Sequence, residues 1–273
     1  MNAPRESKKT AREKAAAARA QALAEEKRRE RMVRIVGSIA VLLVVGGIIG
    51  VAVVATRGSS DSGGGDASSS ATPDPSAPLP KGVLDGASEV APYGVPYGTA
   101  PATAPVLELW EDFQCPACGQ LEREAGASIE KLAEDGKVQL VWRPTTFLDN
   151  NLNNDASKRA AAAWGCAIDG GVTREYHNTV FANQPTTEGD GWTDEQLLQF
   201  GKDSGLEGEA YTAFEKCYTD RTYVGWAVNS TDVFYSSNIP GTPNAILNGT
   251  ELPTATLLDP AELEKAITEA AQQ

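Results

Sequence analysis

One uncharged stretch divides this chain into two parts with opposite charge. Residues 35–55 contain no charged side chain, and at about 1.5 Å per helical residue they would span roughly 30 Å, the thickness of a bilayer's hydrocarbon core. Residues 1–34 carry 11 Lys and Arg against 5 Asp and Glu, so the positive-inside rule places them in the cytoplasm. We therefore predict a basic cytoplasmic segment at 1–34, a single transmembrane anchor at 35–56 and an extracytoplasmic remainder.

A cleaved signal peptide is the alternative interpretation of the same stretch. Its charged leading region would be unusually long, its apolar part is about twice the ordinary length, and no clean Ala-x-Ala cleavage site follows. These three features favour an uncleaved anchor.

The part of the chain after the apolar stretch is acidic. It contains 13 Lys and Arg against 32 Asp and Glu, which argues against a nucleic-acid partner because such a body cannot neutralise phosphates. Residues 57–82 are rich in Gly, Ser and Pro, and predict a tether. Residues 83–273 are long enough for one domain with its own core.

The pattern of this domain is strand, helix, strand, a helical block, a β-hairpin and a final helix. Strands are predicted at 105–110, 137–143 and 245–247, the last followed by the Asn248-Gly249 turn signal. Helices are predicted at 119–134, 155–169, 174–183, 193–205, 207–218 and 223–236, and from Asp259 to the end. The sequence therefore predicts an α/β domain with a helical insertion at about 152–238.

Four cysteines carry the chemistry. Cys115 and Cys118 form a Cys-Pro-Ala-Cys motif where a strand ends and a helix begins. The N–H groups of a helix N-terminus stabilise a thiolate, and C-x-x-C spacing lets the second sulfur close a readily exchanged disulfide. Cys115, with Pro116 and Ala117 after it, is expected to be the exposed nucleophile, and Cys118 the buried resolving thiol.

Two other readings of the motif are weaker. Half of a structural zinc site would need a second ligand pair, but there is no second C-x-x-C and His177 is the only histidine. We therefore predict no metal and no cofactor, and a structural role for His177. An inert structural disulfide is disfavoured by the proline between the cysteines at a strand-to-helix junction.

Three separated segments resemble the DsbA-like group of thioredoxin-fold proteins. They are WEDFQCPAC at 110–118, Thr242-Pro243 before the returning strand, and HNTVFANQP at 177–185. The resemblance implies a thioredoxin fold with an inserted helical subdomain, here preceded by one N-terminal transmembrane helix as in membrane-anchored bacterial members. It also implies a cis peptide bond at Thr242-Pro243, with both residues contacting substrate. The alternative is an ordinary trans proline in a turn.

The sequence departs from the family at two places. The family often has a buried acid six residues before the first cysteine, where this chain has Leu109, and its neighbours Glu108 and Glu111 should point to opposite faces of the strand. Whether either replaces the family's acid stays open. The strongly oxidising prototype has Pro-His between its cysteines where this chain has Pro116 and Ala117. We therefore predict a less oxidising pair, near the middle of the range of roughly −270 to −120 mV.

Cys166 and Cys217 lie 51 residues apart on two predicted helices of the insertion. Because a free thiol is at risk outside the cytoplasm, we predict a structural disulfide between them. The alternative is a second redox pair that relays electrons from Cys118.

The function predicted from these features is extracytoplasmic thiol–disulfide exchange that introduces disulfides into secreted or envelope proteins. The resemblance implies that a quinone-linked membrane oxidase resets the pair. A reductase or isomerase would use the same cysteines in the other direction, and a non-catalytic binding domain would keep only the fold.

Overall fold

The computed structural model describes residues 72–272 of the chain. The basic segment predicted at 1–34, the anchor at 35–56 and most of the predicted linker therefore lie outside the described residues. Within 72–272, no helix combines the length and apolar content that crossing a membrane requires.

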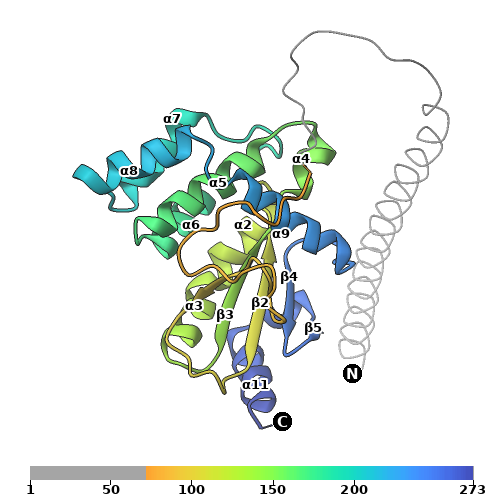
Figure 1. The fold of residues 1–273 in the computed structure, drawn as a ribbon. Coiled ribbons are helices and arrows are strands. Elements are labelled where there is room, and N and C mark those ends of the chain that lie inside the picture. Colours follow the sequence, from red (N-terminus) through yellow and green to blue (C-terminus); the bar gives the residue numbers. More distant parts are fainter. Residues whose placement is uncertain (1–71, 273) are drawn as a thin grey trace, which may run out of the picture. The chain divides into compact units, whose positions relative to one another are not determined.

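A five-stranded sheet in the order β1-β3-β2-β4-β5 lies at the centre of the domain (Figure 1). Its strands are β1 (Val95–Tyr97), β2 (Val106–Glu111), β3 (Gln139–Pro144), β4 (Asn244–Leu247) and β5 (Thr250–Leu252). Only the β2–β3 pair is parallel. The three strands predicted from alternation are present within one or two residues, whereas the short edge strand β1 was not predicted.

The crossover between β2 and β3 is helical but not one regular helix. It consists of α2 (Pro116–Leu121), a π-helical turn η1 (Glu122–Gly126) and α3 (Ala127–Glu134). The prediction of a single helix from residue 119 was wrong at its start, because Pro116 occupies the first helical position with Cys115 as the N-cap. It also missed the π turn, a feature that is often found at functional sites.

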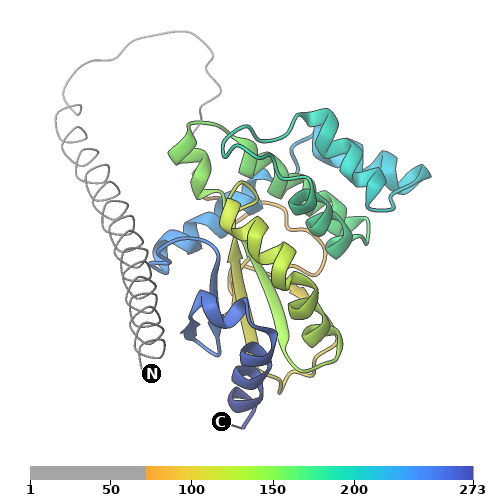
Figure 2. The ribbon, with the colours of Figure 1, turned by 180° about the vertical axis from the view of Figure 1, so that it is seen from behind.

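The two faces of the central strand β2 contact different helices. Trp110 packs edge-on against Phe234 of α9, with ring centroids 5.6 Å apart. The next residue, Glu111, points to the opposite face and meets Glu122 of η1. Figure 2 shows α2 and α3 crossing that face, and α11 contacts α3 there. The sheet is thus covered on both faces, and its fold is the α/β thioredoxin arrangement.

Six helices connect β3 to β4. They are α4 (Phe147–Leu152), α5 (Ala156–Asp169), α6 (Thr173–Ala182), α7 (Asp194–Asp203), α8 (Gly208–Thr219) and α9 (Val224–Ser236). The buried helix α5 contacts all the others. After β5, α10 (Thr254–Leu257) and α11 (Pro260–Ala270) end the fold, with Asp259 capping α11. The predicted helices are all present, and only α4 and α10 were missed.

The end of the predicted linker packs on this helical block. The side-chain amide of Asn229 in α9 donates to the Asp74 carbonyl at 2.7 Å and accepts from the Asp74 N–H at 2.8 Å. Further along, the Lys81 N–H donates to Asp169 at 2.8 Å. The prediction that the tether extends to residue 82 was therefore wrong for its last residues, because Asn229 forms hydrogen bonds with both backbone groups of Asp74.

Candidate active site

The Cys-Pro-Ala-Cys motif lies where β2 leads into α2, as its spacing predicts. Cys115 is the N-cap of α2, with φ −70° and ψ 117°, and Pro116 begins the helix. The turn before it is closed by the Cys115 N–H, which donates to the Asp112 carbonyl at 2.9 Å. Both cysteines are free thiols.

The two sulfurs differ in exposure less than expected. Cys118 is fully buried at 0% exposure, but Cys115 is only 7% exposed, while Pro116 and Ala117 are exposed. The expectation of an exposed nucleophile was therefore wrong in degree. The reason is the loop before β4, which brings the carbonyl oxygen of Thr242 to 3.4 Å from the Cys115 sulfur.

That loop contains the cis peptide bond expected at Thr242-Pro243. Although Thr242 is 127 residues from Cys115 in the sequence, its carbonyl accepts a hydrogen bond from the Cys115 thiol. The Thr242 hydroxyl oxygen is buried without a partner among the described groups, and the Thr242 side chain is one of the groups that lower the pKa of Cys115. The structure thus brings Cys115, Cys118 and the Thr242-Pro243 loop together.

The surroundings of the two sulfurs separate their pKa values. A hydrogen bond from the Cys118 thiol is the largest influence that lowers the pKa of Cys115 to about 6, with further contributions from Thr242 and from the N–H groups of Cys118 and Ala117. Burial raises the pKa of Cys118 well above its ordinary value. Cys115 is thus the thiolate at neutral pH. The helix N–H groups, on which the sequence prediction relied, lower its pKa less than the Cys118 thiol does.

Glu108 and Glu111, the two acids that flank Leu109, lie in different surroundings. Leu109 is a core residue, and the Glu108 carboxylate forms a 2.6 Å ion pair with Arg143 on the other face of the sheet. Glu111 is the acid on the cysteine side. Burial is the main cause that raises its pKa to about 8, and the negative charge of Cys115 adds to the shift.

Sequence reasoning did not predict the groups around Glu111. The His177 imidazole Nε2 lies 3.2 Å from its Oε2, and ligand atoms of Glu111, Glu122 and His177 all lie within 4.8 Å of one another. Such a set could hold a metal ion. Burial also raises the pKa of Glu122 well above its ordinary value, so without a cation both carboxyls favour the neutral form.

Glu122 reaches this position because of the π turn that begins with it. A Cβ atom on Gly126, at the end of that turn, would lie 2.4 Å from a carboxylate oxygen of Glu122. The missing side chain at Gly126 makes room for the carboxylate. One continuous helix was predicted here from the sequence, and the only local feature that could have indicated the π turn is Gly126 within that helix.

A second buried network holds the segment just before Cys115. Gln114 donates to Asp149 at 2.9 Å and to Ser157 at 2.8 Å, and Asp112 accepts from the Gln114 N–H at 2.9 Å and from Ser157. Burial raises the pKa of Asp112 to about 7. These contacts fix the turn that carries the nucleophile.

The other two cysteines form a disulfide away from this site. Cys166 in α5 and Cys217 in α8 are bonded, with their Cα atoms 5.8 Å apart, a distance within the ordinary range for disulfides. The bond joins two helices of the insertion.

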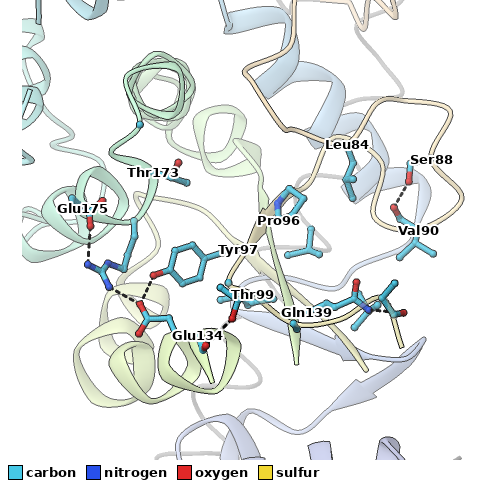
Figure 3. A pocket seen from close by; sticks show the side chains of 18 residues that line it. Leu84, Ser88, Val90, Pro96, Tyr97, Thr99, Glu134, Gln139, Thr173 and Glu175 are labelled. Carbon is cyan, nitrogen blue, oxygen red and sulfur yellow. Dashed lines mark hydrogen bonds and ion pairs between the residues drawn. The ribbon is translucent and has the colours of Figure 1, made fainter. Parts of the chain in front are cut away.

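A large pocket of about 890 Å³ lies along β1, the end of α3 and the start of α6, and contains none of the predicted site residues (Figure 3). Tyr97 donates to Glu134 at 2.6 Å, and Arg174 bonds both Glu134 and Glu175 across its wall. Its charged groups are therefore already paired with one another.

Comparison with known proteins agrees with this geometry. The thioredoxin family profile matches residues 92–269. The Na⁺/H⁺ antiporter NhaA 3 of Salinispora tropica is 29% identical over 150 residues, which are 55% of this chain. Those residues span only 21% of the antiporter's length.

Solved structures give the same fold. Oxidised DsbA of Mycobacterium tuberculosis is 27% identical, with a TM-score of 0.55 over 66% of this chain and 93% of that one. MdbA of Actinomyces oris, a thiol-disulfide oxidoreductase, is 23% identical, with a TM-score of 0.59 over 70% of this chain and 92% of that one. BdbD of Bacillus subtilis is 19% identical, with a TM-score of 0.57 over 66% and 94%. The resemblance read from the three sequence segments is therefore confirmed.

Proposed function

The chain belongs to the thioredoxin family, and from that membership and its cysteine geometry we propose that it is a DsbA-type protein-disulfide oxidoreductase that introduces disulfides into secreted or envelope proteins. The observation that carries the proposal is the split between the two thiols. The pKa of Cys115 is lowered to about 6, while that of Cys118 is raised. This is the division between nucleophile and buried partner that disulfide exchange needs.

The same split between the two thiol pKa values supports the oxidising direction. A thiolate at Cys115 stabilises the reduced pair, and a stabilised reduced form makes the corresponding disulfide a stronger oxidant. A reductase or isomerase would use the same atoms in reverse. The ease of forming the Cys115 thiolate favours oxidation of the substrate.

The reaction runs in two exchange steps. A substrate thiolate attacks the Cys115 sulfur of the Cys115–Cys118 disulfide, which forms a mixed disulfide and releases Cys118. A second substrate thiolate then attacks the substrate sulfur of that mixed disulfide and releases Cys115 as a thiolate. Two electrons pass from the substrate, which becomes a disulfide, to the enzyme pair, which becomes reduced.

Glu111 is the proton donor that we propose for the first step, because its charge acts on the buried Cys118 sulfur. Cys118 leaves as a thiolate inside the protein, where a charge is costly. With a pKa of about 8, Glu111 is mostly protonated at pH 7 and can donate to that sulfur. In the reverse direction it accepts the proton.

The proposed setting is the outer side of the cytoplasmic membrane. A quinone-linked membrane oxidase would withdraw the two electrons from the reduced pair, and the anchor at 35–56 would keep the domain near it. The sequence supports this placement through the charge asymmetry around the apolar stretch.

The test uses the full chain, purified in detergent and oxidised. It should convert a reduced two-cysteine peptide to its disulfide in stoichiometric amounts. Cys115→Ser should abolish exchange, whereas Cys118→Ser, mixed with the disulfide form of the peptide, should accumulate mixed disulfides because its Cys115 thiolate attacks that disulfide and no second enzyme thiol resolves the product. Equal loss in both variants without trapping would contradict the assigned roles, and no exchange by the wild type would favour a binding domain. The redox state of the pair in cells, oxidised or reduced, would decide the direction.

A further inference from the structure

A single amide links the helical insertion to the backbone of the nucleophile. Gln184 follows α6, and its Nε2 donates to the Phe113 carbonyl at 2.8 Å and to the Cys115 carbonyl at 2.9 Å. An amide nitrogen carries two hydrogens, so each of its donors is used. The two carbonyls belong to the turn that ends at the reactive cysteine.

The opposite side of this amide is also fitted to the site. A Cβ atom on Gly119 would lie 2.1 Å from the Gln184 Oε1. Gly119 lies inside α2 with ordinary helical backbone, where glycine is costly relative to alanine. The glycine is therefore explained by the space that the Gln184 amide occupies.

The backbone that carries Gln184 is itself anchored. The preceding carbonyl, of Asn183, accepts from the Trp192 indole at 2.9 Å, and the Gln184 N–H donates to the Phe181 carbonyl at 3.2 Å. Trp192 and Phe181 are both buried. The amide thus extends from a fixed support rather than from a free loop.

We propose that Gln184 is a positioning residue for the redox pair: it holds the Cys115–Pro116 peptide so that the Cys115 sulfur faces the N–H groups of Ala117 and Cys118. The Cys115 carbonyl also accepts the Gly119 N–H at 3.1 Å. Two donors on one carbonyl fix the plane of the first peptide of α2. That plane sets where the sulfur lies relative to the helix N-terminus.

The chemistry of the side chain explains why a glutamine is suitable. A carboxylate at this position would place a third acceptor against two carbonyls, and a leucine of similar size would leave both carbonyls without this donor. A lysine would add a charge beside the Cys115 thiolate. Only a primary amide offers two neutral donors on one atom.

The inference deepens the proposed function, and the test reads the sulfur directly rather than turnover. In the reduced full chain, the pH dependence of Cys115 alkylation gives its pKa, and equilibration with glutathione gives the potential. Gln184→Leu should lower the thiolate-limited alkylation rate at pH 5, below the wild-type midpoint, by roughly fivefold, as expected for about one lost hydrogen bond. Gln184→Glu should lower it further. Both should make the pair less oxidising.

The matched controls are Gln120→Leu and Gln120→Glu. Gln120 is an exposed residue of α2 that bonds Glu124 at 2.9 Å, so its variants make the same chemical changes close to Cys115 without touching its carbonyl. The alkylation rate of Cys115 in these variants should stay within about twofold of the wild-type rate. Equal shifts from the Gln184 and Gln120 variants would overturn the proposal.

Gly119→Ala tests the same amide from its other side, because the added methyl group would collide with the Gln184 Oε1. It should displace the amide and raise the pKa of Cys115 even though alanine favours the helix. In a Gln184→Ala background the same change should have no further effect on that pKa, because the amide is already absent. If the two changes instead shift the pKa of Cys115 additively, the proposal is overturned. This test does not depend on whether Gln184→Glu folds. An ordinary pKa for Cys115 in the wild type would instead refute the proposed function.

Discussion

His177 and Glu111 meet inside the protein, with the imidazole Nε2 3.2 Å from the carboxyl Oε2 and side chains only 2% and 5% exposed. The other ring nitrogen lies 3.1 Å from the Asn178 side-chain oxygen. The ring also stacks on Trp142, with centroids 4.7 Å apart. The histidine is therefore held on three sides, and it fixes the orientation of the acid that we propose as the proton donor to Cys118.

Replacing Glu111 with Gln tests the proposed proton donor. The variant keeps the shape of the side chain but cannot deliver a proton, so release of Cys118 from the disulfide should slow by roughly tenfold or more at pH 7. Stopped-flow reduction of the oxidised chain by a small thiol measures this step. Glu124→Gln, at an exposed acid of η1, should leave the rate unchanged. If Glu111→Gln reacts as fast as the wild type, another group protonates Cys118.

The reactivity of Cys115 should follow pH with a midpoint near 6, the value to which its pKa is lowered. Alkylation is fast above this pH, where the sulfur is a thiolate, and declines as the pH falls through 6 and the thiolate is protonated. Because the bond from the Cys118 thiol is the largest cause, Cys118→Ala should move the midpoint toward that of an ordinary thiol. Iodoacetamide kinetics on the reduced protein measure both. An unmoved midpoint would assign the shift to the backbone instead.

The cysteine pair could be predicted from the sequence because a local pattern specifies it, whereas the cis bond at Thr242-Pro243 was implied only by the family resemblance. A strand that ends at a Cys-Pro pair predicts an N-cap, and the structure has Cys115 at that position. The contact between Cys115 and Thr242 required the family resemblance, since 127 residues separate them. Local spacing alone carries no information about that distance.

The acid cluster could not be predicted for a different reason. His177 was expected to be structural, since one histidine in an aromatic helical segment gives no sign of a carboxylate 66 positions away. Glu122 resembles any charged residue of an amphipathic helix. Only the π turn, which departs from regular helical periodicity, directs it inward. Alternation along β2 did predict that Glu108 and Glu111 lie on opposite faces of the sheet. It did not indicate which of the two lies on the same face as the cysteines.

Ala117 should set the potential of the pair. It is exposed, and its N–H is one of the groups that lower the pKa of Cys115. Its methyl group adds no charge. We expect a potential near the middle of the range of roughly −270 to −120 mV, and Ala117→His should raise it because an imidazolium would stabilise the thiolate further. Equilibration with glutathione measures both proteins. A wild-type value at either end of the range, or no rise in the variant, would show that this position is a poor guide.

The Cys166–Cys217 bond should stabilise the insertion without taking part in exchange. It closes a loop of 51 residues between α5 and α8, which in the chain-entropy model is worth about 4 kcal/mol. Replacing both cysteines with Ala should lower the free energy of unfolding in urea by about that amount, while oxidation of a dithiol peptide continues under conditions where the variant stays folded. Under graded reductant, mass spectrometry should show Cys115–Cys118 opening well before this bond. Simultaneous opening, or a folded double variant without activity, would instead identify Cys166 and Cys217 as a second redox pair that exchanges electrons with Cys118.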